Sequence, residues 1–309
     1  MRVAVVDLGT NSTRLLVADV DGAGAISEVD RRTEVTRLGQ GVDATGALAP
    51  EAVERVAAVL RGFRAAIDEH GAERTVAVLT SAVRDASNGA GFTRRVRDEF
   101  GLDARTIGGD EEARLTFRGA TAERPAGAPA PVVVIDIGGG STEYVVGDAS
   151  GVRFHTSTQS GAVRQSERHL RSDPPTPAEL AALRGEVRAI IERAVPAEVR
   201  ARTRAAIAVA GTATSLAAID QKLEPYDPDR VHGYVLPLER AAAHLDALAR
   251  LTDSERRRVP GLLPARAPTI VAGAAHLVEA LEAFSLDSGE VSEHDILRGA
   301  ALEAVHRAT

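Results

Sequence analysis

The feature that most constrains this chain is a nine-residue pattern that occurs twice. Residues 5–13 read VVDLGTNST and residues 134–142 read VIDIGGGST, so an acid, a glycine, a serine and a threonine fall at the same positions. Each copy begins in an apolar run and is followed by a second one, which is Leu15–Ala18 in the first copy and Tyr144–Gly147 in the second. Runs rich in β-branched residues with no helical period are typical of buried strands. A chance repeat would not keep all four residue types together, so the pattern predicts two related strand–turn–strand units, one in each of two domains.

The turn of each unit has the composition of an anion-binding loop. Glycines allow a tight turn that directs several backbone N–H groups at one anion, and hydroxyls add further donors. A glycine-rich hairpin with no ligand is the alternative for a single copy, and the duplication favours phosphate binding. The predicted phosphate-binding residues are Gly9, Thr10, Asn11, Ser12, Gly138, Gly139, Gly140, Ser141 and Thr142.

An acid ends the first strand of each unit, Asp7 in one copy and Asp136 in the other. A carboxylate repels phosphate directly but can hold a divalent cation that bridges to it. An aspartate at a strand end can also simply form a turn. The symmetric repetition favours positioning of a metal or a water molecule.

Composition limits the partners. The chain has 309 residues, enough for two domains, and its net charge of −7 argues against a general nucleic-acid binder. It has no cysteine, no charged-then-apolar leader and no apolar run of membrane-spanning length, so we expect a cytoplasmic protein without membrane contact. Lys222 is the sole lysine, which rules out a P-loop with its lysine after the glycines. A polyanionic ligand would need a local arginine lining or metal ions.

Strands followed by helices in both halves indicate an α/β fold with ligands at the strand ends. The Pro-, Ala- and Gly-rich segment 123–131 is the expected domain link. Strands are expected at Val3–Asp7, Arg14–Asp19, Ala25–Leu38, Arg74–Thr80, Ala104–Ile107, Val132–Ile137, Tyr144–Gly147 and Ala205–Ala210. Helices are expected at Pro50–Gly71, Phe92–Phe100, Gly161–Arg171, Ala178–Ala194, Leu238–Arg250, Ser254–Val259, Pro268–Ala283 and Asp295–Ala308, with one more opening at Asp110-Glu111-Glu112.

Taken together, these motifs resemble those of the acetate and sugar kinase/chaperone/actin superfamily. Its two phosphate motifs correspond to residues 7–12 and 136–143, and its third glycine turn to Gly211-Thr212. Residues 80–88 and 111–115 narrow the resemblance to the exopolyphosphatase/guanosine pentaphosphate phosphohydrolase (Ppx/GppA) family. The chain ends without the extra helical region of longer members, so it resembles the short two-domain branch.

The resemblance implies a fold and a set of roles. The fold is a pair of actin-like (ribonuclease H-like) domains, each a mixed sheet flanked by helices, with an interdomain cleft. The domains would be residues 1–127, completed by a C-terminal helix 293–309, and residues 128–292. The implied catalytic residues are Glu112, as general base, and Arg84, on the substrate phosphate; the implied Mg²⁺ ligands are Asp7, Asp136 and Glu143. Gly211 and Thr212 would bind a nucleoside or a polymer tail, or only cap a helix.

The implied activity is metal-dependent hydrolysis of the terminal phosphate of inorganic polyphosphate. Hydrolysis of guanosine pentaphosphate is the close alternative, since the same phosphate machinery would serve it. A small-molecule kinase or a non-catalytic phosphate-polymer sensor of the same superfamily is a further alternative. A homodimer is the expected assembly.

Overall fold

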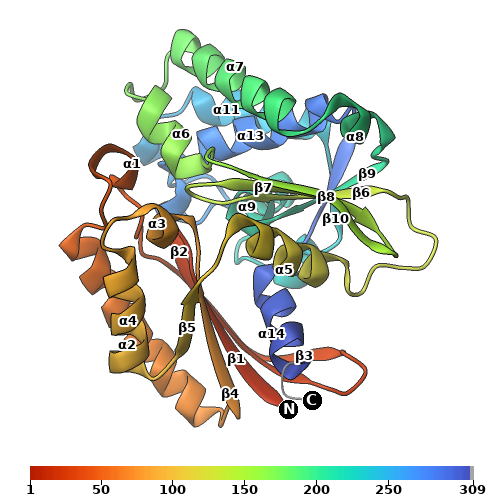
Figure 1. Ribbon diagram of the computed structural model, residues 1–309. Helices are drawn as coiled ribbons and strands as arrows, with labels where there is room; N and C mark the ends of the chain where they lie inside the picture. Colours follow the sequence, from red (N-terminus) through yellow and green to blue (C-terminus); the bar gives the residue numbers. More distant parts are fainter. Residues whose placement is uncertain (307–309) are drawn as a thin grey trace. The chain divides into compact units, whose positions relative to one another are not determined.

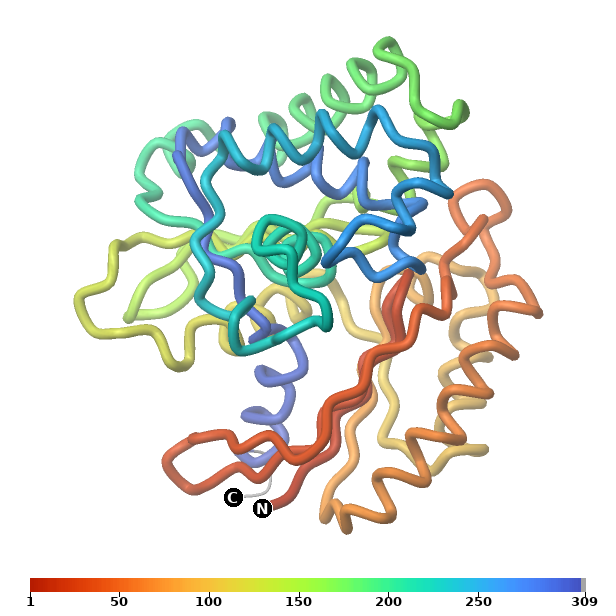
Figure 2. Tube along the Cα trace, turned by 180° about the vertical axis from the view of Figure 1, so that it is seen from behind, coloured from red at the N-terminus to blue at the C-terminus, as the bar shows by residue number. Residues whose placement is uncertain are grey.

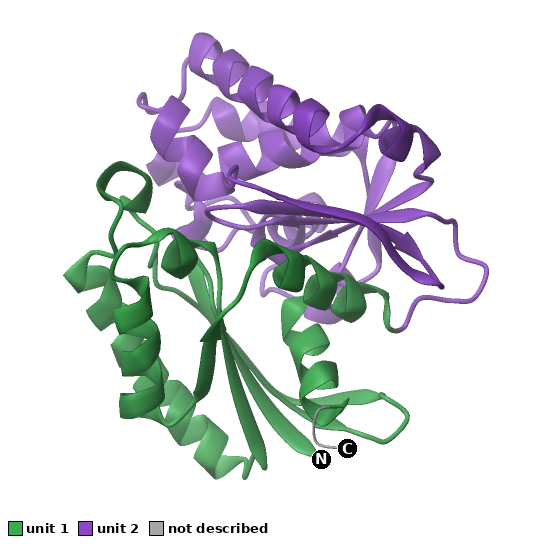
Figure 3. Cartoon of the chain, in the orientation of Figure 1, with its two compact units in different colours: residues 1–122, 295–309 green, residues 123–294 purple. Residues whose placement is uncertain are grey.

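The computed structural model describes residues 1–306, which form two compact units (Figure 3). Unit 1 comprises Met1–Ala122 together with the chain from Asp295 onward, and unit 2 comprises Glu123–His294. The chain therefore passes between the units twice, after Ala122 and after His294. The predicted C-terminal helix extends to residues 307–309, which lie outside the described residues.

Unit 1 is built on a five-stranded mixed sheet in the order β3-β2-β1-β4-β5. Strand β1 pairs antiparallel with β2 and parallel with β4, so the first hairpin lies inside the sheet. The strands are β1 (Arg2–Leu8), β2 (Ser12–Val20), β3 (Ile26–Val35), β4 (Arg74–Leu79) and β5 (Asp103–Thr106). The helices are α1 (Val42–Thr45), α2 (Pro50–Glu69), α3 (Ser81–Asp85), α4 (Gly89–Phe100), α5 (Gly109–Thr121) and α14 (Ile296–His306).

Alternating residues of β1 explain how this sheet is covered. Ala4, Val6 and Leu8 belong to a core shared with α2 and α4, while Val3 and Val5 belong to a second core shared with α14. Successive strand side chains point to opposite faces. The sheet is therefore buried on both sides, with α2 and α4 on one face and α5 and α14 on the other (Figure 1).

Unit 2 is built on a six-stranded mixed sheet in the order β10-β11-β9-β6-β7-β8. The strands are β6 (Val132–Ile137), β7 (Thr142–Asp148), β8 (Gly151–Thr158), β9 (Ala205–Val209), β10 (Tyr234–Pro237) and β11 (Ser288–Val291). The helices are α6 (Ala162–His169), α7 (Pro177–Ala194), α8 (Ala197–Arg202), α9 (Ala210–Gln221), α10 (Pro228–Val231), α11 (Leu238–Ala249), α12 (Asp253–Arg256) and α13 (Ile270–Ala283), with a short 3₁₀ turn at Pro264–Arg266.

Helix α13 is the centre of the unit 2 core. Its residues Ile270–Leu281 are buried all round, and it packs against α6, α7, α9 and α11. A helix that is buried on every side needs neighbours on every side. Figure 2 shows α11 and α13 lying side by side in this unit.

The predicted α/β class with two mixed, helix-flanked sheets is confirmed, and three strands were missed. The expectation that the second unit ends in helices overlooked β10 and β11, each of only four residues. Strand β8 was overlooked because its exposed side chains, such as Val152 and Arg153, give it no continuous apolar run. The third glycine turn was also wrong in form: Ala210, at φ 63°, turns the chain sharply and α9 begins there, so Gly211 lies in a first helical turn.

Among residues 1–306, no helix combines the length and the apolar character that crossing a bilayer requires.

Two glycines allow α5 and α14 to cross closely. A Cβ on Gly119 would lie 1.9 Å from the Asp295 carbonyl oxygen, and a Cβ on Gly299 would lie 1.8 Å from the Leu115 carbonyl oxygen. Neither position has room for a methyl group unless the backbones separate. We expect Gly119→Ala and Gly299→Ala each to lower the free energy of unfolding by about 1–3 kcal/mol, although alanine favours helix.

Gly62→Ala is the matched control, because Gly62 is an exposed glycine of α2 with nothing within 4 Å of its missing Cβ. It should raise the free energy of unfolding by up to about 1 kcal/mol. Urea denaturation of the three variants measures both effects. Stabilisation by all three substitutions would contradict the close crossing.

Candidate active site

The two hairpins that carry the repeated motif have the same register. In unit 1, Asp7 lies opposite Arg14, and in unit 2, Asp136 lies opposite Glu143. In both turns the first glycine leaves little room for a side chain, since a Cβ on Gly9 or Gly138 would lie 3.0 Å from the carbonyl oxygen of the serine three residues on. The duplication read from the sequence is therefore present in the backbone as well.

Unit 2 holds the carbonyl groups of its glycine loop from one side. The N–H groups of Ala162 and Val163 donate to the carbonyls of Gly138 and Gly139, both at 2.9 Å. The Nε of Arg164 donates to the third carbonyl, that of Gly140, at 2.9 Å. In a planar trans peptide the N–H points opposite to the carbonyl. The N–H groups of residues 139–141 therefore point away from α6, and neighbouring N–H groups that are not used within the protein can donate to an anion.

Unit 1 holds its loop in the same manner with a different segment. The Gly39 N–H donates to the Thr10 carbonyl at 2.8 Å, and the N–H groups of Thr36 and Arg37 donate to the Asn11 carbonyl at 3.0 and 2.9 Å. The N–H groups of Asn11 and Ser12 consequently point away from that segment. Neither set of contacts was predicted, because each lies far from its loop in sequence.

The residues opposite the two acids give the hairpins different charges. Arg14 donates to Asp7 Oδ2 from Nε at 2.9 Å and from Nη2 at 2.7 Å, and its Nη1 also contacts the carboxylate of Asp295. Burial raises the pKa of Asp7 above its usual range, although Arg14 acts to lower it. The Oδ1 atom of Asp7 is buried without a hydrogen-bond partner among the described residues. Unit 1 therefore already contains a cation, the Arg14 guanidinium, beside its motif acid.

In unit 2 the same register places a second acid beside the first. Asp136 is 7% exposed and Glu143 is 1% exposed, and Ser157 Oγ donates to Glu143 Oε1 at 2.7 Å. Two buried carboxylates on neighbouring strands repel each other unless a cation lies between them. Carboxylate oxygens are the ligands that Mg²⁺ prefers, so this pair fits a divalent cation better than the Asp7–Arg14 pair does.

Unit 1 also brings together the predicted arginine and the predicted base. Arg84, on α3, donates from Nη1 to Glu112 Oε2 at 3.0 Å and to the Ile107 carbonyl at 3.1 Å. Glu112 is buried in the first turn of α5. Thr10 Oγ1 and Ser81 Oγ are 2.9 Å apart, which links the first phosphate loop to the helix that carries Arg84.

The neighbouring acids of α5 have separate partners. Glu111 contacts Arg105, while Glu112 contacts Arg84. Adjacent helical residues diverge by about 100° around the axis, which explains the separation. Only Glu112 is buried next to the arginine of the motif.

Three predicted phosphate-binding residues have other contacts in the structure. Thr142 is buried, and its hydroxyl donates to the Ser160 carbonyl at 2.5 Å. Thr212, in the first turn of α9, packs against Gly273 of α13, and Gly211 packs against the guanidinium of Arg266. Their roles in phosphate binding stay predictions. Gly211 nevertheless follows closely after a residue that lies beside Asp136, because Val209 of β9 pairs with Asp136 of β6.

Comparison with known proteins agrees with these features. The family model described as the Ppx/GppA phosphatase family matches residues 5–308. The chain is 41% identical to Exopolyphosphatase 2 of Mycobacterium tuberculosis, over 97% of this chain and 98% of that protein. Its structure superposes on that of an exopolyphosphatase-like protein with a TM-score of 0.93 at 36% identity, covering all of both chains. It also superposes on the Aquifex aeolicus Ppx/GppA family member with a TM-score of 0.83 at 33% identity, covering 100% of this chain and 99% of the other.

A buried histidine supports the segment that follows the second phosphate loop. Ser160 Oγ lies 2.9 Å from His276 Nε2 and accepts a hydrogen bond from Gln165 Nε2 at 3.0 Å. His276 Nδ1 lies 3.2 Å from the Ala272 carbonyl, so a neutral ring can donate there and accept from Ser160. Burial lowers the pKa of His276 from 6.5 to about 4.

This histidine predicts a loss of stability in mild acid. The unfolded chain binds the proton near pH 6.5 and the folded protein only near pH 4, so stability is complete above pH 6.5 and falls between these values. The loss is up to about 3 kcal/mol, from 1.36 kcal/mol per pKa unit. Urea denaturation at about pH 7.5 and about pH 5 should show a smaller drop for His276→Gln than for the wild type. His155→Gln, at an exposed position of β8, should keep the wild-type drop; equal drops in all three proteins would contradict the assignment.

Proposed function

Because the chain belongs to the Ppx/GppA phosphatase family, we propose that it is an exopolyphosphatase that hydrolyses the terminal phosphoanhydride bond of inorganic polyphosphate and releases orthophosphate. The observation that carries this proposal is the 41% identity to Exopolyphosphatase 2 of Mycobacterium tuberculosis over 97% of the chain. Its two glycine loops and its Arg84–Glu112 pair supply the groups that such a reaction needs.

In this proposal the N–H groups of each glycine loop donate to phosphate oxygens of the substrate. Asp136 and Glu143 would hold Mg²⁺ or another divalent cation. When bound, such an ion neutralises phosphate charge and so makes displacement at phosphorus easier. Asp7 keeps Oδ1 for a further ligand, since its Oδ2 is paired with Arg14.

The remaining chemistry belongs to Arg84 and Glu112. Arg84 Nη1 is held by Ile107 and Glu112, which leaves Nη2 to donate to a phosphate oxygen. A guanidinium so placed stabilises the charge of the transition state. The Glu112 carboxylate accepts the proton of the attacking water, and Arg84 keeps this carboxylate oriented. The proton of water goes to Glu112 and its hydroxyl oxygen bonds to the terminal phosphorus. The bond from this phosphorus to the bridging oxygen breaks, and the shortened polyphosphate leaves with that oxygen.

Guanosine pentaphosphate is the second candidate substrate, because the same phosphate-binding and catalytic groups would act on its terminal phosphate as on that of polyphosphate. Purified protein with Mg²⁺ and one substrate at a time separates the candidates. Orthophosphate release from polyphosphate, and not from guanosine pentaphosphate or ATP, supports the proposal; release only when a phosphate acceptor is added would instead identify a kinase. The division into domains 1–127 with 293–309 and 128–292, the homodimer and the cytoplasmic location stay predictions.

The acid pair of α5 gives the sharpest test of mechanism. Glu112→Gln keeps the size of the side chain and its contact with Arg84 but cannot take a proton. We expect kcat to fall about 10²–10⁴-fold while polyphosphate binding largely persists. Glu111→Gln, which changes the side chain that contacts Arg105, should lose far less activity.

Phosphate release and polyphosphate binding, measured for both variants, decide the assignment. If Glu112→Gln turned over normally and Glu111→Gln were inactive, the base would be the other carboxylate. If both stayed active, the base would lie outside this pair, with Asp7 and Glu143 as the next candidates.

Salt should weaken binding of long polyphosphate steeply, although the protein carries a net charge of −7. A polyanion must lie along local cationic groups, and release of its counterions makes affinity depend on salt concentration. Titrations of long-chain polyphosphate at about 50 and about 200 mM salt measure the effect. An affinity that did not change would favour the small nucleotide as substrate.

A further inference from the structure

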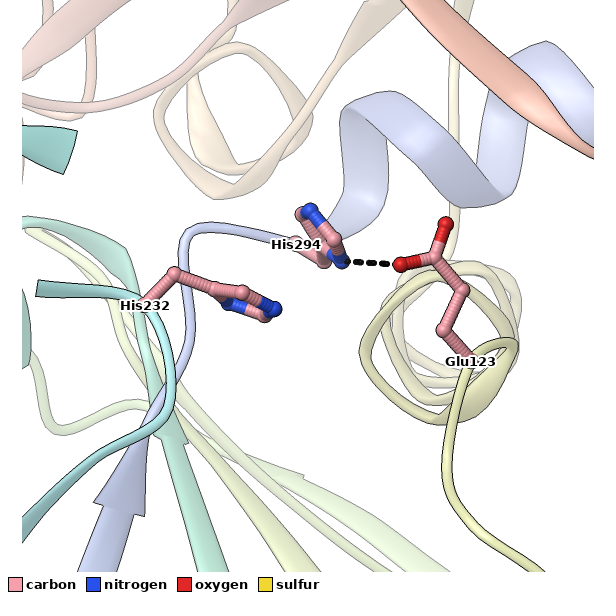
Figure 4. Close-up of side chains that lie close together, drawn as sticks. All are labelled: Glu123, His232 and His294. Carbon is pink, nitrogen blue, oxygen red and sulfur yellow. Dashed lines mark ion pairs between the residues drawn. The ribbon is translucent and has the colours of Figure 1, made fainter. Parts of the chain in front are cut away.

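Three side chains of metal-binding type meet in unit 2, apart from the phosphate loops (Figure 4). Glu123 follows α5, His232 ends α10, and His294 follows β11. One ligand atom from each lies within 4.8 Å of those of the other two. His294 Nδ1 is 3.6 Å from Glu123 Oε2, and the two imidazole rings have their centroids 3.9 Å apart. Figure 4 shows the ring of His232 extending toward the other two side chains.

The composition of this cluster selects one class of ion. Two imidazoles and a carboxylate form the ligand set that binds Zn²⁺ in many proteins, with bonds of about 2.0–2.2 Å. Two ligands on one tetrahedral ion lie about 3.3 Å apart at such bond lengths, close to the 3.6 Å between His294 and Glu123. Imidazole ligands favour Zn²⁺ and its transition-metal neighbours, while Mg²⁺ favours oxygen ligands alone.

The segment 292–294 supplies one ligand and also contacts another. Ser292 Oγ accepts from the His294 N–H at 2.9 Å and lies 3.4 Å from His232 Nδ1. If His232 binds an ion through Nε2, its Nδ1 carries the proton and can donate it to Ser292 Oγ. The Glu293 N–H, 3.3 Å from Nδ1, then gives up its contact with that nitrogen. Ligand histidines are commonly held by such a hydrogen bond from the other ring nitrogen.

The position of the cluster in the chain gives it structural significance. Glu123 is the first residue of unit 2 and His294 is the last, so the two segments that cross between the units each contribute a ligand (Figure 3). An ion bound here would join these two segments to each other and to the loop after α10.

We propose that Glu123, His232 and His294 bind one Zn²⁺-class ion, distinct from the divalent cation at Asp136 and Glu143. Three protein ligands leave a fourth position for water in a tetrahedral site. The site goes beyond the proposed phosphatase activity, since none of its residues belongs to the phosphate loops or to the Arg84–Glu112 pair.

The test uses the full-length protein, stripped with a chelator and titrated with Zn²⁺ in excess Mg²⁺ by calorimetry. We expect one equivalent of Zn²⁺ to bind, and His232→Ala and Glu123→Gln each to weaken binding at least about tenfold. Titration of the wild type with Co²⁺ should give the visible absorption of a four-coordinate ion. This absorption should be absent from the double variant that combines His232→Ala and Glu123→Gln. His155→Ala, which removes an exposed histidine of β8, should bind as the wild type does.

Glu123→Gln and Asp136→Asn make the binding experiment decisive. Glu123→Gln alters a side chain that is 54% exposed, so its fold should persist even if the histidine variant is unstable. Asp136→Asn should leave Zn²⁺ binding unchanged. Binding that survived the double variant, or that Asp136→Asn abolished, would overturn the proposal. Because the readout is metal binding, it is independent of whether polyphosphate is the substrate.

Discussion

The register of the two hairpins is the constraint on which the site depends. In each hairpin four residues, 9–12 or 138–141, lie between the last paired positions of the two strands. The acid one position earlier lies opposite Arg14 in one copy and opposite Glu143 in the other. A shift of one residue would move every side chain to the opposite face of the sheet. The tight first glycines and the carbonyls held from α6 and from residues 36–39 prevent that shift. They also leave the loop N–H groups directed toward the side where an anion can bind.

The same register gives the two halves different chemistry. In unit 1 an arginine faces the motif acid and offsets its charge, whereas in unit 2 a glutamate faces it and two buried carboxylates lie on neighbouring strands. The two similar loops therefore lie beside different pairs of side chains, and the acid pair of unit 2 is where we propose the divalent cation. This difference depends on one cross-strand residue in each hairpin, Arg14 or Glu143.

Much of the fold could be predicted from local signals. The α/β class, the two loops and the long helices follow from apolar periodicity and from the repeated motif. Strands β10 and β11 could not be recognised, because four residues carry too little pattern and only the neighbouring strands make them part of a sheet. Contacts between residues far apart in sequence were missed for the same reason. His276 contacts Ser160, which lies 116 positions away, and Gly39 of the segment after β3 contacts Thr10 of the first loop. Arg14 was the exception that sequence could have revealed, since the length of the turn already places it opposite Asp7.

The last helix explains how unit 1 keeps its acid and its base in fixed positions. Helix α14 crosses α5 through Gly119 and Gly299, and α5 carries Glu112 in its first turn. Asp295, just before α14, contacts Arg14, which in turn holds Asp7. The pKa of Asp295 is lowered by Arg14 and Arg31 despite its burial, so it stays charged and keeps this contact at neutral pH. The C-terminal segment that contains Asp295 and α14 therefore contacts both Arg14, the partner of Asp7, and α5, the helix of the proposed base. Its packing in unit 1 thus supports both parts of the proposed site.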